Sequence, residues 1–206
     1  MDNMKKFVYI PLFTGKSVWK YQVNKGDTLL VMIFGYTSFD ALITVTLKGA
    51  GASAVITGIL IGNGNTKQIL HTMQIHKAKN TKSNLLVKTV LSGEASCLYD
   101  GGIRVEKKAQ KADAYQRNEN LLLSDHAYAE SKPSLEILAN DVRCTHGATV
   151  STINEEQLWY LVSRGISVQG ARRLISEGFI QSALERIGDR DVKRSILSLW
   201  QRTSKR

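Results

Sequence analysis

Short apolar runs rich in β-branched residues recur through the first two-thirds of the chain, and several alternate apolar with polar positions, as residues 43–47 do. A period of two is typical of a strand with one buried face. Glycine-rich corners separate the runs, and no helical pattern comes between them. This rhythm fits a sandwich, a barrel or a β-solenoid. The predicted strands are 28–34, 42–47, 54–61, 68–75, 85–91, 103–105, 121–123, 135–138 and 142–150.

The last quarter of the chain changes to the period of an α-helix. Asn154 is a good N-cap and Gly165 a good stop, so we expect a helix between them. Apolar positions at helical spacing predict a second helix over 167–178 and a short third one over 179–187. Asp189 is placed to cap a fourth.

We therefore divide the chain into a β-rich core, residues 1–153, and a helical region, residues 154–206. The 206 residues are 43% hydrophobic, which is enough for a core. Two cysteines without a Cys-x-x-Cys motif fit a reducing cytosol. The apolar run 7–13 contains a proline and lacks a cleavage site, and the run 54–61 is too short to span a bilayer. We expect a soluble, cytoplasmic protein with no membrane partner.

The net charge of +10 is spread along the whole sequence. Nucleic-acid-binding proteins usually concentrate such charge on one face with aromatic or helical readout elements. We therefore interpret it as a solvated basic surface that could steer an acidic partner, and we do not expect nucleic acid as the partner. A basic β-rich module that binds nucleic acid or another polyanion remains the alternative hypothesis.

Cys144 and His146 lie two residues apart, so a strand points both side chains to one face. A thiol and an imidazole there can bind a metal or contact a partner chain. The alternative is a structural role, with one side chain packed inward. His71 and His76 would face opposite sides of a strand and are expected to be structural, and Cys97 is expected to be a small buried apolar residue.

Enzyme signatures are missing from the sequence. The glycines at 62 and 64 precede polar residues without Gly-Lys-Ser/Thr, so they form a turn and not a phosphate loop. The sequence has no nucleophile elbow and no conspicuous carboxylate pair. We predict that the chain is not an enzyme.

Residues 141–165 read DVRCTHGATVSTINEEQLWYLVSRG. This stretch resembles the core of the SufB/SufD family, the scaffold proteins of the SUF iron–sulfur cluster assembly machinery. SufB-type members carry a functional cysteine followed by Gly-Ala-His about where this chain reads Ser131-Lys132-Pro133, so the resemblance is to SufD. It covers roughly residues 65–187. Further matching segments are His71, His76, 80–83, 90–93, 109–116, 118–124 and 131–137.

The resemblance implies a mainly β fold: a right-handed parallel β-helix (β-solenoid) followed by a small C-terminal α-helical region. It implies two partners, a SufC-like ABC ATPase docked on the C-terminal helices and a SufB-like sister subunit, or a second copy of this chain, paired through the β-helix. It places His146 at that pairing interface, with Cys144 as an accessory ligand, so that a transient iron–sulfur cluster would need donors from a second chain. For ATPase docking we predict Arg172, Arg173, Phe179 and Ile180.

Overall fold

The computed structural model describes residues 4–203, which form eleven strands followed by three helices. The strands are β1 (Lys5–Leu12), β2 (Lys16–Val23), β3 (Thr28–Gly35), β4 (Phe39–Leu47), β5 (Ser53–Gly62), β6 (Lys67–His76), β7 (Lys82–Leu91), β8 (Ser96–Val105), β9 (Ala112–Leu122), β10 (Tyr128–Ile137) and β11 (Val142–Thr152). The helices are α1 (Glu155–Ser163), α2 (Val168–Leu184) and α3 (Arg190–Thr203).

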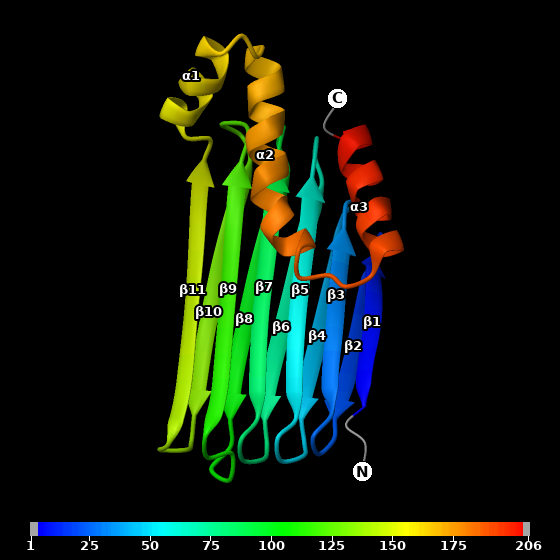
Figure 1. Ribbon diagram of the computed structural model, residues 1–206, viewed down its shortest axis with the longest axis vertical. Coiled ribbons are helices and arrows are strands. Elements are labelled where there is room, and N and C mark those ends of the chain that lie inside the picture. The colour runs from blue at the N-terminus through cyan, green and yellow to red at the C-terminus, as the bar shows by residue number, and fades with distance from the viewer. Residues whose placement is uncertain (1–3, 204–206) are drawn as a thin grey trace.

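Successive strands alternate between two parallel sheets (Figure 1). The odd-numbered strands form one sheet in the order β1-β3-β5-β7-β9-β11, and the even-numbered strands form the other in the order β10-β8-β6-β4-β2. Every paired strand is parallel to its neighbour, so each coil of the chain adds one strand to each sheet. The predicted fold class, a parallel β-solenoid followed by a helical region, is confirmed.

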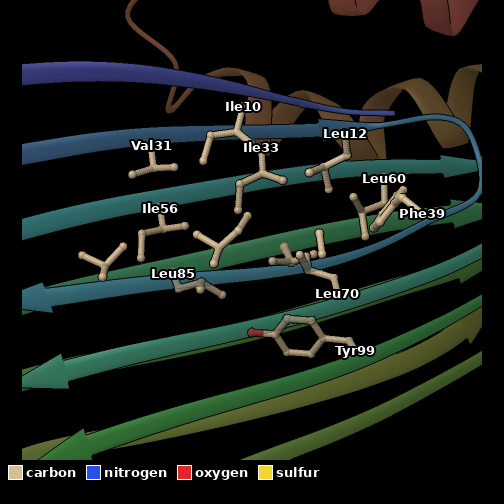
Figure 2. Close-up of a cluster of buried hydrophobic side chains, with 14 of the residues drawn as sticks. Ile10, Leu12, Val31, Ile33, Phe39, Ile56, Leu60, Leu70, Leu85 and Tyr99 are labelled. Carbon is tan, nitrogen blue, oxygen red and sulfur yellow. The ribbon is translucent and has the colours of Figure 1, made fainter. Parts of the chain in front are cut away.

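The core lies between the two sheets, where every second residue points inward (Figure 2). The middle coils fill it with aliphatic side chains such as Ile33, Ile56 and Leu60, all with at most 2% of their surface exposed. Burying one such side chain contributes roughly 1.5–3 kcal/mol, and stacked coils repeat that gain along the axis. Tyr99 stands at the edge of this cluster, where the interior becomes polar.

α2 and α3 pack on the outer face of the six-stranded sheet near the ends of its strands, and α1 lies beyond the end of β11 beside α2 (Figure 1). Phe34 and Ile59 of the sheet share one buried cluster with Ile180 of α2 and Trp200 of α3. Asn154 caps α1, its Oδ1 accepting from the N–H of Gln157 at 3.0 Å. The separation of two domains at residue 153 stays a prediction, because this shared cluster joins the helices to the solenoid.

The predicted helix end at Gly178 is wrong, and the two helices expected on either side of it are one continuous helix, α2. A glycine inside a helix costs about 1 kcal/mol relative to alanine. The residues that follow repay that cost by packing: Ile180, Ala183 and Leu184 are all buried against the sheet. Ser167 caps this helix and Asp189 caps α3, its Oδ1 accepting from the N–H groups of Asp191 and Val192.

The first two strands were not among the predicted ones. β1 contains Pro11 and carries Lys5 and Lys6, and half of the eight residues of β2 are polar. Both strands form the end of the solenoid, where only one side has a neighbouring coil. End strands need fewer aliphatic residues than strands inside the stack, so their pattern is weak.

Lysines that are spread along the sequence come together on one row of turns, at the bottom of Figure 1. This lysine row follows the connections from even- to odd-numbered strands. The opposite turns, 13–15, 36–38, 63–66, 92–95 and 123–127, contain no lysine or arginine. The exposed lysines of the row are Lys25, Lys48, Lys77, Lys79, Lys107, Lys108 and Lys111.

Candidate functional site

The candidate site is the last coil of the solenoid, formed by β10 and β11. β11 pairs only with β9, and β10 only with β8, so within residues 4–203 each has one open edge. No further coil covers their inward faces. Leu135, Ile137 and Val150 point inward in register with the preceding coil, yet they are 37%, 41% and 49% exposed. We call these inward faces of β10 and β11 the open end.

Cys144 and His146 lie on the open end, as the two-residue spacing predicts. Their register partners on β9 are Ala114 and Gln116, which are both buried and inward-facing. The structure therefore places both side chains on the face that a next coil, or a partner chain, would cover.

Cys144 is half-buried and packs against the small cluster that includes Ala112 and Ala114. Burial raises the pKa of its thiol, a hydrogen bond with the backbone of Ala114 partly offsets this rise, and the charge of Asp113 adds to it. The thiolate is the metal-binding form, so the isolated chain disfavours it. A cation or a metal ion bound at the open end would stabilise the thiolate and so lower the pKa of Cys144.

His146 is exposed, and a buried chain of polar side chains lies directly behind it. Gln116 donates through Nε2 to the carbonyl oxygen of Gly101 at 3.0 Å and accepts from Nε2 of Gln74 at 3.2 Å. Gly101 is required for this contact, because a Cβ there would lie 2.4 Å from Nε2 of Gln116. The imidazole of His146 therefore lies next to buried amide side chains and not next to an apolar core.

A second polar group lies beside it, and the sequence reasoning did not find it. Asn120 donates through Nδ2 to Oδ1 of Asn118 at 2.7 Å and to the carbonyl oxygen of Thr149 at 3.0 Å. Ser131 of β10 also donates to Oδ1 of Asn118. The signal was present in the alternation Gln116, Asn118, Asn120, which has the period of a buried strand face but polar residues. These amides hold β11 and β10 in place at the open end.

Two donors do not make a metal site. Within residues 4–203, no group of three or more His, Cys, Asp or Glu side chains is arranged to hold a metal ion. His71 and His76 lie on β6 and do not join the open end: His71 pairs with Asp100, and His76 is buried between the hydroxyl groups of Thr81 and Ser83. Any cluster held by Cys144 and His146 must take its remaining ligands from elsewhere.

The residues predicted for ATPase docking lie on α2, which packs on the outer face of the six-stranded sheet. Arg172 is exposed and Arg173 half-buried, and Nη1 of Arg172 reaches the carbonyl oxygen of Leu123 at 3.5 Å. Phe179 packs under Nζ of Lys88, 4.3 Å from its ring centroid, and Ile180 is completely buried. Two of the four side chains are therefore used in the chain's own packing.

A more exposed apolar surface lies on α1, outside the four residues predicted for ATPase docking. Trp159 and Tyr160 are 70% and 60% exposed. Beside them is a hollow of about 390 Å³, lined mostly by apolar surface, to which Leu161 and Ile175 contribute. The signal in the sequence was the pair of adjacent aromatic residues, of which a single helix can bury at most one.

No helix within the described residues is both long and apolar enough to cross a membrane.

Comparison with known proteins agrees with this geometry. The family described as "SUF system FeS cluster assembly, SufBD core domain" matches residues 31–179. The chain is 35% identical to the iron–sulfur cluster assembly protein SufD of Escherichia coli over 152 residues, 74% of this chain and 36% of that protein. It is 32% identical to SufD of Bacillus subtilis over 162 residues, 79% of this chain and 37% of that protein.

SufB of Bacillus subtilis is 33% identical over 135 residues, 66% of this chain and 29% of that protein. The chain thus spans little more than a third of the length of its SufD relatives. The matched stretch contains β4 to β11, α1 and most of α2, and so includes the open end with Cys144 and His146. The chain belongs to the SufBD family of the SUF iron–sulfur cluster assembly system.

Proposed function

We propose that this chain is a SufD-like scaffold subunit that pairs through the open end of its solenoid, with a SufB-like sister chain or with a second copy of itself. The observation that supports this most strongly is the open end, where apolar side chains and the unpaired edge of β11 lie beside Cys144 and His146. Two such ends facing each other would cover the exposed apolar surface and satisfy the free backbone groups.

The cargo of this scaffold is an iron–sulfur cluster in assembly. One chain supplies one thiol and one imidazole, and a pair of chains supplies two of each or adds the cysteines of a sister chain. Pairing would bring both donors into a drier site, where a nascent cluster is shielded from water. In this proposal the chain itself catalyses no covalent step, and its two free cysteines fit a reducing cytoplasm.

A matched pair of substitutions tests the pairing. Val150 lies on the open end and is 49% exposed, whereas Val18 lies on β2 at the opposite end and is 62% exposed. Val150→Lys places like charges against each other in a symmetric pair, so we expect the dimer to weaken at least about tenfold. Val18→Lys should leave it unchanged. Sedimentation equilibrium of each variant, alone and mixed with a SufB-like chain, measures its self-association and its association with that chain. Equal effects of the two substitutions would refute pairing at this end.

We place the dock for a SufC-like ABC ATPase on α1 and α2. Tyr160 lines the hollow between these helices, and Trp159 is exposed next to it on α1; exposed Trp and Tyr side chains beside a pocket are frequent anchors of an interface. ATP hydrolysis could then move the helices as a rigid unit against the solenoid. Arg172 and Arg173 lie on the same helix as Ile175, which lines the hollow, and we include them in the proposed ATPase dock.

Co-purification with a SufC-like ATPase tests the dock. Trp159→Ala and Tyr160→Ala together should reduce ATPase retention at least about tenfold, since aromatic anchors commonly carry 2 kcal/mol or more. Val168→Ala, on the exposed start of α2, is the control and should retain it. Full retention by the double variant, or no binding of any SufC-like protein by the native chain, would overturn the docking proposal.

Anaerobic reconstitution tests the cargo site. We expect the native chain, with the ATPase and a candidate sister chain, to develop the visible absorption of an iron–sulfur cluster. His146→Ala should abolish or greatly reduce it, and His71→Ala should not, because His71 lies in a different part of the fold. Normal absorption of the His146→Ala variant would show that the imidazole of His146 is not part of the cluster-assembly site.

A second candidate function, binding of a polyanion, is favoured by the lysine row. Neighbouring turns of a solenoid stack at about 4.8 Å, so the row forms a continuous basic ridge. Only Lys77 of its seven lysines forms an ion pair within the described residues, with Glu106. If the ridge binds a polyanion, retention on heparin or DNA should weaken steeply with salt, and replacing Lys79, Lys107 and Lys108 by glutamine should abolish it. Weak, salt-insensitive retention would exclude this function.

A further inference from the structure

A cavity of about 310 Å³ lies between α2, α3 and the turns that end β5 and β7. Its floor is apolar, made by Val90, Leu123 and Trp200 among others. Gln169, Arg172, Arg173 and Ser176 of α2 also line it. These four positions are spaced i, i+3, i+4 and i+7, so one face of the helix turns polar side chains toward this floor. A helix that only packed here would place apolar residues at these positions.

The charged residues that line this cavity are both basic, Arg172 and Arg173. None of the described residues that line it is acidic. Neither Arg172 nor Arg173 forms an ion pair within residues 4–203, and Arg172 makes only the long hydrogen bond to the carbonyl of Leu123. Glu94 and Asp125 lie in the turns nearby but do not line the cavity. Two guanidinium groups beside a half-enclosed apolar floor favour an anion there.

Asn63 adds a donor whose direction is fixed. Its Oδ1 accepts from the N–H of Gly64 at 2.7 Å and from Oγ of Ser92 at 3.1 Å. Both bonds engage the oxygen, so the amide orientation is set and the Nδ2 group remains available as a donor. No hydrogen bond of this Nδ2 occurs within the described residues, although Asn63 is half-buried and lines the cavity.

We propose that this cavity binds a small organic anion with a flat apolar body and a terminal phosphate or carboxylate. The guanidinium groups of Arg172 and Arg173 and Nδ2 of Asn63 bind the anionic group, and Trp200 and Leu123 contact the apolar body. The site is independent of cluster assembly at the open end. Because the ligand would contact both α2 and α3, it would hold these two helices together on the sheet.

Trp200 provides the readout, because it lines the cavity and is only 2% exposed. In a Trp19→Phe, Trp159→Phe background it is the sole tryptophan. We expect phenyl phosphate to change its emission saturably. Inorganic phosphate and phenol, which each carry half of the ligand chemistry, should bind at least about tenfold more weakly. Benzoate in place of phenyl phosphate distinguishes a carboxylate from a phosphate site.

Two variants make the test specific. Arg172→Gln with Arg173→Gln should weaken phenyl phosphate at least about tenfold, since each charge-assisted hydrogen bond lost is a large fraction of the binding. Asn63→Asp keeps both hydrogen bonds to the side-chain oxygen but removes the donor and adds a negative charge, so it should abolish binding without disturbing the turn. Arg190→Gln, on the exposed start of α3, is the matched control and should bind normally.

Unfolding of each variant by denaturant confirms that the fold is intact. Equal binding of phenyl phosphate by the native chain, the arginine double variant and Asn63→Asp would overturn the proposal. So would a Trp200 response to phenol as strong as that to phenyl phosphate, because that would be apolar binding without anion recognition.

Discussion

The two ends of the solenoid are built differently. At the first end, Ile10, Leu12 and Val23 belong to the terminal coil but are no more than 3% exposed, and the partly buried Tyr21 packs against the same cluster. At the last end, Leu135, Ile137 and Val150 point inward and are 37%, 41% and 49% exposed. The first end covers more of its inner face, although Trp19, in register with the buried Ile43, is 36% exposed.

The two edge strands of the six-stranded sheet also differ, whereas β10, the edge of the other sheet at the last end, carries Pro133 together with Glu130, Lys132 and Glu136. β1 carries Pro11, which cannot donate a backbone hydrogen bond, together with Lys5 and Lys6. β11 has no proline, and Arg143 is its only charged residue. Charge and proline on an edge strand discourage pairing with another chain. The comparison teaches that a pairing edge in a solenoid can be recognised by the lack of proline and charged residues on it, as well as by the residues that are present.

The largest effect should come from the column of inward residues that contains both Leu60 and Val150, which are in register through β7 and β9. Leu60→Ala leaves a cavity in the closed core and should lower the free energy of unfolding by about 3–4 kcal/mol. Val150→Ala in the monomer should cost less than about 1 kcal/mol. Urea unfolding measures both. Similar costs at the two positions would mean that the last end is as well packed as the middle coils.

The next effect concerns pH. His76 marks the change from the aliphatic to the polar half of the core, and burial lowers its pKa to about 4 although the charge of Asp113 opposes this. Between pH 6.5 and 4 the unfolded chain binds a proton that the native chain does not. The free energy of unfolding should therefore fall by roughly 3 kcal/mol as the pH falls through this window, and level off below it.

The difference between the native chain and His76→Asn isolates this contribution from the acidic residues. Unfolding free energies of both, measured from pH 7.5 to 4, should converge as the pH falls. Parallel curves would show that His76 does not set the acid sensitivity.

The smallest effect separates the two cysteines. Cys97 is 1% exposed, and burial raises its pKa to about 12. Cys144 lies on the open end. A thiol reagent should label Cys144 in the native monomer and Cys97 only after unfolding, and Cys144→Ala should change the free energy of unfolding by less than about 1 kcal/mol. Pairing should protect Cys144; labelling of Cys97 at the same rate would contradict the closed core.

The strands of the middle coils could be predicted because their inward positions are largely Leu, Ile and Val, as at Leu29, Val31 and Ile33 of β3. β8, β9 and β10 were predicted only as fragments, since their inward positions are largely Tyr, Gly, Gln, Asn and Ser. The period of two was intact there, but the hydrophobic contrast that reveals it was lost. A polar residue gives a visible strand signal only when its hydrogen-bond partner is known, and that partner lies on another coil.

The candidate site was predictable in part for the same reason. The spacing of Cys144 and His146 gave their common face, but nothing local indicated that this face ends the stack. The surroundings of Ile180 depended on α2 continuing past Gly178 and docking on the sheet, which is a tertiary outcome. Pairing between distant coils also created the lysine row and the cavity under α2, neither of which has a local sequence signature.

Pro11 and its neighbouring lysines have one more consequence. A solenoid with two bare ends could add copies head to tail without limit, because parallel coils have no intrinsic stop. If two chains pair through the open end as proposed, Pro11 and the lysines of β1 would disfavour further addition at the other end. The assembly would then be a discrete pair of chains instead of a fibre.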